Sequence, residues 1–203
     1  MPYNPDKHHR RSIRLKGYDY AAEGLYFITL CTAQRQCLFG VIVNGQMQLN
    51  SLGQIVAHEW MKTPQIRPNF DLDAWVVMPN HIHGIVVIHS SHPPNDESTP
   101  VGAHRRAPRG LTTHGGEPPP NAKPGIAYRR PHSVSSFVAG FKAVTTKQIN
   151  IQRNTAGTPI WQRNYYEHII RSEDSLHYIQ QYIHNNPVTW RDDQLHPANP
   201  SKI

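Results

Sequence analysis

Two histidines spaced for one face of a strand form the first candidate site in this sequence. His81 and His83 follow the turn Pro79–Asn80 and open an apolar run that ends at Ile88. Residues two apart in an extended chain point to the same face, so the two imidazoles would lie side by side, as in half of a divalent-metal site. The spacing alone is also typical of two core or surface histidines, because the chain contains 14 histidines.

A second group of candidate residues recurs every four positions near the end of the chain. Tyr178, Tyr182 and Asn186 would stack on one face of a helix. The tyrosines could simply flank the core. Alternatively, Tyr182 supplies a phenolic nucleophile and Asn186 a ligand oxygen. Two imidazoles and an amide oxygen would leave coordination positions open, which suits Mg²⁺ or Mn²⁺ better than a closed structural zinc site.

Tyrosine needs help to act as a nucleophile, because its free pKa is about 10. A cation beside a phosphate would offset charge and orient the phosphorus for in-line attack. A phosphotyrosine would conserve the energy of the broken bond, so that strands could be rejoined without ATP. The sequence contains no P-loop motif that would supply nucleotide energy.

Periodicity predicts the elements that would position these residues. Apolar and β-branched runs predict strands, apolar residues at helical spacing predict helices, and Asn44–Gly45 predicts a hairpin turn. Ser51 and Ser172 are expected to cap helices. The expected strands cover 25–32, 70–78, 81–89 and 160–170, and the expected helices cover 51–62, 134–149 and 172–185.

This order is strand, helix, strand, strand, helix, strand and a final helix. It predicts an α+β protein with a ferredoxin-like, split β-α-β antiparallel sheet, whose C-terminal helix carries Tyr182. In that topology the first and third strands are central. The run Ile85–Ile88 is apolar on both faces, as expected of a central strand.

The domain organisation follows from length and composition. The chain has 203 residues, enough for one domain with extensions. We expect a basic arm at 1–20, a single domain at 21–190 and an irregular tail at 191–203. Proline, glycine, histidine and arginine dominate residues 91–132, which are expected to form a flexible loop inside the domain.

Charge and cysteine content limit the partners and the compartment. The net charge of +7 favours a polyanionic partner, with nucleic acid first. Two cysteines, Cys31 and Cys37, form no disulfide framework and fit a reducing cytosol. No apolar run reaches about 18 residues, and Met1–Lys16 lacks the apolar core of a signal peptide, so neither a membrane span nor secretion is expected.

Four segments of the sequence together resemble a known family. His81-Ile82-His83 after Met-Pro-Asn is similar to the His-hydrophobic-His signature of HUH single-strand nucleases. The blocks at 161–168 and 182–187 and the opening at 10–20 resemble the single-tyrosine transposases of that superfamily, in their REP-associated (RAYT) branch. The resemblance covers most of residues 10–190, except the loop.

The resemblance implies an activity and a set of site residues. It implies a metal-dependent endonuclease and strand transferase that acts on single-stranded DNA, recognises hairpins and forms a 5′-phosphotyrosine intermediate. By position, Tyr182 matches the nucleophile, and His81, His83 and Asn186 match the ligands of Mg²⁺ or Mn²⁺. Such a protein would be bacterial, cytoplasmic and nucleoid-associated. Family members differ in whether the tyrosine helix serves its own subunit or a partner's, so a homodimer stays open.

We expect DNA contacts from basic residues and from base-stacking aromatic residues. Trp161, Tyr165 and Tyr166 could stack on bases, although at least one of them is expected in the core. The expected basic contacts are Arg10, Arg11, Arg14, Lys16, Lys142 and Arg163.

Two other functions are compatible with the sequence. A non-catalytic, domesticated descendant could bind hairpin DNA and act by occupancy. A replication-initiation or conjugative nuclease is a third alternative, although such proteins usually carry further histidine or tyrosine motifs.

Overall fold

A computed structural model describes residues 18–89 and 130–199 of the chain. Most of the predicted basic arm and of the predicted loop 91–132 lies outside the described residues, as do Arg10, Arg11, Arg14 and Lys16.

Four strands form one antiparallel sheet in the order β4-β5-β1-β6. The helices between them give the element sequence of a split β-α-β fold, with β1 and β5 at the centre. The predicted α+β, ferredoxin-like class and its central strands are therefore confirmed. The strands are β1 (Gly24–Cys31), β4 (Phe70–Met78), β5 (His81–Ile88) and β6 (Tyr166–Ile170).

A separate hairpin joins β2 (Gly40–Val43) to β3 (Gln46–Leu49). Its turn residues Asn44 and Gly45 have φ values of 51° and 74°. Two successive positive φ angles fit the type I′ turn that the Asn-Gly pair favours, so the predicted hairpin is confirmed.

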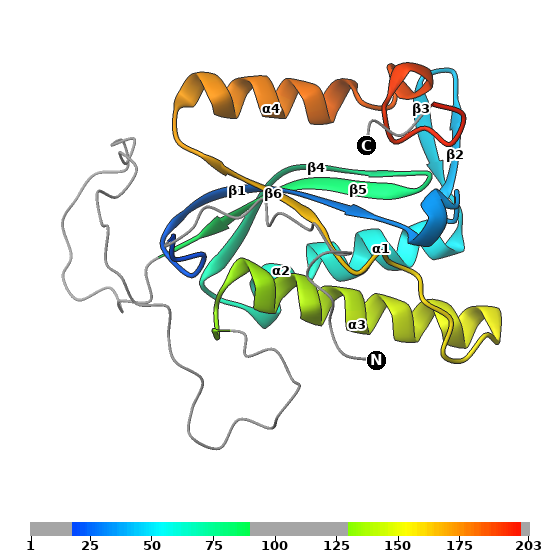
Figure 1. The fold of residues 1–203 in the computed structure, drawn as a ribbon, viewed down its shortest axis with the longest axis horizontal. Helices are drawn as coiled ribbons and strands as arrows, with labels where there is room; N and C mark the ends of the chain where they lie inside the picture. Colours follow the sequence, from blue (N-terminus) through cyan, green and yellow to red (C-terminus); the bar gives the residue numbers. More distant parts are fainter. Residues whose placement is uncertain (1–17, 90–129, 200–203) are drawn as a thin grey trace, which may run out of the picture.

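The sheet lies between two layers of helices, as Figure 1 shows. Helix α4 (Glu173–Asn185) covers one face, and α1 (Ser51–Met61) and α3 (Val134–Arg153) cover the other. A short helix, α2 (Thr63–Ile66), follows α1, and 3₁₀ turns occur at Ala33–Arg35 and Trp190–Asp192. No helix among the described residues is long and apolar enough to cross a bilayer.

Two predicted helix boundaries need correction. The cap of α1 is Asn50 and not Ser51, because the Asn50 side chain accepts hydrogen bonds from the backbone N–H of Leu52 and of Gly53, both at 3.0 Å. Helix α3 continues past the expected end at 149 to Arg153, where Asn154 adopts a left-handed conformation that stops it. The predicted cap of α4 at Ser172 is confirmed.

The predicted strand 160–170 is also too long, because regular pairing begins only at Tyr166. Lys142 on α3 explains the difference. Its ammonium donates to the backbone carbonyls of Gln162 at 2.7 Å and Asn164 at 2.9 Å. These carbonyls are thereby held toward α3, and only an isolated bridge at Trp161 joins this segment to the sheet.

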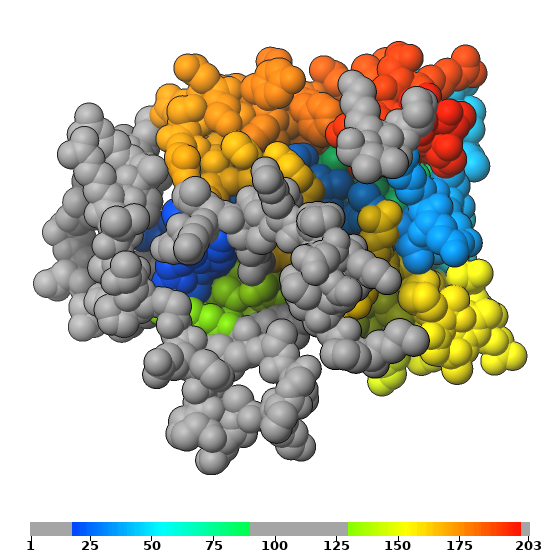
Figure 2. Space-filling model, viewed as in Figure 1, coloured from blue at the N-terminus to red at the C-terminus, as the bar shows by residue number. Residues whose placement is uncertain are grey.

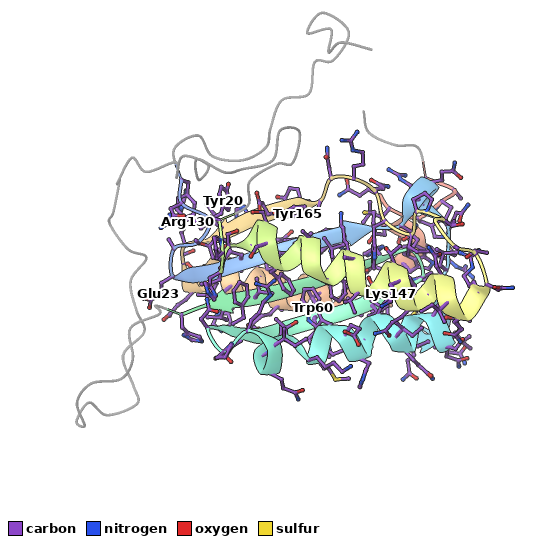
Figure 3. The ribbon with its side chains drawn as sticks, turned by 90° about the horizontal axis from the view of Figure 1, so that it is seen from below. Tyr20, Glu23, Trp60, Arg130, Lys147 and Tyr165 are labelled. Atoms are coloured by element: carbon purple, nitrogen blue, oxygen red, sulfur yellow. The ribbon has the colours of Figure 1, made fainter. Side chains whose placement is uncertain are left out.

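The larger core lies between the sheet and helices α1 and α3. Tyr26, Ile28 and Leu30 of β1 face it and are completely buried. Trp60 of α1 packs directly on Gly84 of β5, where a Cβ atom would lie 2.3 Å from the indole. Figure 3 labels Trp60 on this side of the sheet. A glycine is therefore required one residue after His83.

A smaller apolar cluster lies under α4, on the opposite face. It contains Phe27 of β1, Ile85 of β5, Ile170 of β6, and Ile179 and Ile183 of α4. These contacts fix α4 on the sheet face that carries the two histidines.

Candidate active site

His81 and His83 lie next to each other on the face of β5 that α4 covers. Their exposed fractions are 0% and 2%, and their ring centroids are 4.4 Å apart. In the strand register, His81 lies opposite Cys31 and His83 opposite Thr29 of β1. The predicted pair of imidazoles on the central sheet is confirmed in this geometry.

The turn residue Asn80 fixes the orientation of His81. Its side-chain Nδ2 donates to the carbonyl of Arg35 at 3.1 Å and of Leu195 at 2.8 Å. Because both donors are used, Asn80 Oδ1 accepts a hydrogen bond from His81 Nδ1 at 2.8 Å. The lone pair of His81 is therefore on Nε2, which is buried and has no hydrogen-bond partner among the described residues.

Thr29 fixes the orientation of the His83 ring in the same way, through Nδ1. Its Nδ1 lies 2.8 Å from Thr29 Oγ1, and its Nε2 lies 3.2 Å from the hydroxyl of Tyr182. Both histidines thus anchor Nδ1 on an oxygen of the protein and turn Nε2 toward the site. Metal-binding histidines commonly have this arrangement, because the anchored nitrogen fixes the ring and its tautomer.

Helix α4 brings Tyr182 and Asn186 to the histidines. Ser172 caps the helix, acids in its first turn favour its N-terminus, and Ile179 and Ile183 seat it on the sheet. Asn186 follows Tyr182 by one turn and is 1% exposed. Its Oδ1 is buried and has no hydrogen-bond partner within the described parts of the chain.

Asp193 is a site residue that sequence reasoning missed. It follows the 3₁₀ turn Trp190–Asp192, in the tail that was expected to be irregular. Its Oδ2 accepts from Asn186 Nδ2 at 2.8 Å, and its Oδ1 accepts from the backbone N–H of Leu195 at 2.6 Å. Ligand atoms of His81, His83 and Asp193 all lie within 4.8 Å of one another.

The sequence gives little signal for Asp193. A polar tail shows no periodicity, and Asp192 beside it is an equal candidate by type. The position becomes significant only when the tail folds back, so that Leu195 accepts from Asn80 and Asp193 holds Asn186.

The residues present fit a divalent cation. His81 Nε2 and Asn186 Oδ1 are the buried polar atoms of this site without a partner among the described residues, and unpaired buried polar atoms are costly unless a ligand satisfies them. Imidazole nitrogen, amide oxygen and carboxylate oxygen together form a mixed N,O set. This set contains no thiolate, so a structural zinc site is not favoured.

Electrostatics keeps both imidazoles in the form that binds metal. Burial lowers the pKa of His81 to about 4, although the Asp193 carboxylate and the Asn186 amide oppose the shift. Burial and the neighbouring His81 hold the pKa of His83 well below its usual value. Both rings are therefore neutral at pH 7, with no proton to displace before coordination.

The phenol of Tyr182 is held in its protonated form. Burial raises its pKa to about 12, and the charges of Asp193 and Tyr178 act in the same direction, whereas the Asn186 amide opposes them. Ionisation of this phenol at neutral pH would thus require a nearby positive charge.

Two cavities meet at Tyr182. The smaller, of about 280 Å³, is lined by Tyr182, Asn186, Thr189, Asp192, Asp193 and Gln194. The larger, of about 650 Å³, lies against β1, β6 and α4. It is lined by Phe27, Thr29, Cys31, His83, Gln162, Asn164, Tyr165, Tyr166, His168, Ser175, Tyr178, Ile179, Tyr182, Gln194 and Leu195. In Figure 2, α4 and the residues that follow it lie along one side of the molecule, next to part of β1.

The predicted DNA contacts that the structure describes differ in their surroundings. Arg163 is exposed. Lys142 is engaged with the two carbonyls described above and lies 5.7 Å from the centre of the Tyr165 ring. Burial lowers its pKa to about 8. Contact of either residue with DNA stays a prediction.

The three residues predicted to stack on bases also differ in their burial. Trp161 is buried and donates its indole N–H to Thr145 at 2.9 Å, so it belongs to the core as expected for one of the three. Tyr165 is half-buried and packs against the larger core, and Figure 3 labels it beside α3. Tyr166 is 47% exposed and reaches the larger cavity.

Comparison with other proteins gives one clear relative. A protein of Haemophilus influenzae, described as uncharacterized, is 40% identical over 195 residues, which cover 96% of this chain and 97% of that protein. The two chains belong to one protein family. No family model matches the sequence.

Two solved structures are similar at low identity. A REP-associated tyrosine transposase bound to a REP hairpin is 20% identical, with 97% of this chain and 90% of that chain covered and a TM-score of 0.47. A protein of Deinococcus radiodurans provisionally named a transposase is 17% identical, with 86% and 97% covered and a TM-score of 0.40.

Proposed function

We propose that this protein is a metal-dependent endonuclease and strand transferase, a transposase that acts on single-stranded DNA beside hairpins through Tyr182. The observation that carries the proposal is the 3.2 Å contact between the Tyr182 hydroxyl and His83 Nε2, beside two buried polar atoms without partners. The motifs at 81–83 and 182–187 and the net charge of +7 support the same activity and a DNA substrate.

The cation would be held by His81, His83 and Asn186, with Asp193 as a further ligand or as the group that orients Asn186. We propose Mg²⁺ or Mn²⁺ from the donor set. When bound, the cation offsets the charge of the scissile phosphate and lowers the cost of ionising a neighbouring phenol. The chain itself contributes neutral imidazoles, a fixed amide and a buried phenol.

The proposed reaction is a transesterification at phosphorus. Tyr182 Oη loses its proton to water and attacks the phosphorus, and the bond from phosphorus to the 3′ oxygen breaks. The products are a 5′-phosphotyrosine on Tyr182 and a 3′-hydroxyl that gains a proton. Attack by another 3′-hydroxyl reverses the step, joins the strands and returns the phenol, so no ATP is required.

The catalytic unit that we propose combines the predicted domain 21–190 with Asp193 from the predicted tail. Because Tyr182 contacts His83 of its own chain, one subunit would suffice, and a homodimer is not required. We place the protein in the bacterial cytoplasm, at the nucleoid, since chromosomal hairpins are its proposed substrate.

The test is covalent capture of labelled hairpin oligonucleotides in the presence of Mn²⁺. A denaturing gel should show a protein–DNA adduct that retains a 3′-end label and loses a 5′-end label. Tyr182→Phe should abolish the adduct, because it removes only the attacking oxygen. Tyr18→Phe is the matched control, since its hydroxyl lies near Tyr26 at the far end of β1. Hairpin binding without an adduct on any substrate would instead indicate a non-catalytic binder.

A further inference from the structure

The larger cavity has a lining that the proposed chemistry does not use. One end of it is formed by His83 and Tyr182, and the remainder extends along β6 and α4. The residues that line this remainder include the aromatic Tyr166 and Tyr178, together with Gln162 and Asn164, whose side chains carry amides. Among the described residues that line it, there is no lysine, arginine, aspartate or glutamate.

This lining fits a nucleobase better than a phosphate. A phosphodiester is normally bound by arginine, lysine or a helix N-terminus, because its charge needs compensation. A base instead offers a flat aromatic face and an edge of neutral donors and acceptors. Tyrosine rings can stack on that face, and glutamine and asparagine side chains can bond to the edge.

We propose that this cavity binds an unstacked nucleobase of the single strand next to the phosphate that Tyr182 attacks. The inference rests on the proposed function for the position of the strand, and it adds a base-binding subsite to it. A volume of about 650 Å³ accommodates one base together with part of its sugar. A base inside a duplex could not enter, so the subsite would select single-stranded DNA.

Lys142 fixes the backbone segment that forms one wall of the proposed subsite. Its two hydrogen bonds hold the backbone at Gln162 and Asn164, two of the residues that line the cavity. The Tyr165 ring lies beside the same ammonium. Lys142, whose ammonium binds both of these carbonyls, is thus a positioning residue for the subsite.

Tyr166 is the stacking residue that can be tested without harming the fold. It lies on β6, opposite Thr29, and its ring meets that of Phe27 edge to face, with centroids 6.1 Å apart. Almost half of its surface is exposed in spite of its apolar ring. Removal of one stacking ring is expected to weaken single-strand binding about 5- to 150-fold.

The experiment measures binding in the Tyr182→Phe background, so that it does not depend on cleavage. Hairpins with randomised single-stranded flanks are first selected for binding to this variant. Each flank position of a selected hairpin is then replaced in turn by an abasic site. One position should lose affinity, and Tyr166→Ala should lose affinity on intact DNA whereas Tyr166→Phe retains it.

The decisive measurement combines the abasic DNA with the Tyr166→Ala variant. With the abasic site at the sensitive position, Tyr166→Ala and its parent should bind equally, because no base remains to stack. An equal penalty for Tyr166→Ala on intact and abasic DNA would overturn the subsite, as would the absence of any sensitive position. Loss of the Tyr182 adduct in the otherwise unmodified protein would overturn the proposed function and leave this result standing.

Discussion

The contacts of Asp193 predict that it controls the affinity of the site for its cation. Asp193→Ala removes the acceptor that holds Asn186 Nδ2 at 2.8 Å, so the amide is no longer fixed with Oδ1 in the site. It also releases the backbone N–H of Leu195, whose carbonyl anchors Asn80 behind His81. One substitution therefore loosens the support of two proposed ligands and removes a negative charge near the cation.

The expected loss can be estimated from these contacts. Removal of a residue that orients metal ligands typically weakens metal affinity by roughly 10- to 100-fold. A loss of that size lowers the stabilisation that Mn²⁺ gives to the folded protein by about 1.4 to 2.8 kcal/mol, at Mn²⁺ concentrations well above both dissociation constants.

The assay is calorimetric titration of the DNA-free protein with Mn²⁺, together with thermal unfolding with and without the ion. Asp192→Asn is the control, because this neighbouring carboxylate is exposed and its change also removes one charge. Asp193→Asn should be intermediate, since one oxygen can still accept from Leu195 or Asn186. Unchanged Mn²⁺ affinity in a folded Asp193→Ala protein would refute the role, as would an equal loss in Asp192→Asn.

Three further predictions concern the sheet, the histidines and the cavity wall. Gly84→Ala should destabilise the protein by about 1–3 kcal/mol or more in denaturant unfolding, because the added Cβ meets the Trp60 ring, and normal stability would contradict that packing. The unfolded state takes up a proton on His81 near pH 6.5, but the folded state does so only near pH 4. Metal-free stability should therefore be complete above pH 6.5 and fall by about 3 kcal/mol toward pH 4 from this group, and His81→Gln should flatten the profile. Lys142→Met should speed hydrogen exchange around Gln162, and unchanged exchange would contradict its positioning role. If Lys142 also contacts a phosphate, as the sequence predicts, the substitution should in addition reduce the salt slope of DNA binding by about 1.

Much of this fold follows from local patterns in the sequence. The apolar runs of β1 and β5, the Asn44–Gly45 turn and the Ser172 cap each express a local preference that the folded protein keeps. The predictions fail where a residue distant in the sequence determines the local structure. Lys142 removes the carbonyls of Gln162 and Asn164 from the sheet, and no pattern within 160–170 contains that information.

In the site, too, local patterns predict some features and others depend on the folded chain. His81 and His83 are visible as a pair, and Tyr182 and Asn186 as a helical stripe, because each pair lies on one element. That the two pairs meet depends on α4 crossing the sheet, which requires the fold. Asp193 does not lie in a helix or strand with a periodic sequence pattern, so only the folded chain identifies it as a site residue.

The most direct test of the central claim is mass spectrometric mapping of the protein–DNA adduct formed with Mn²⁺ and a hairpin oligonucleotide. Proteolysis followed by fragmentation should place a nucleotide remnant on Tyr182, joined through its 5′ phosphate. A remnant on any other residue, or a protein that cleaves DNA and never carries one, would contradict the mechanism.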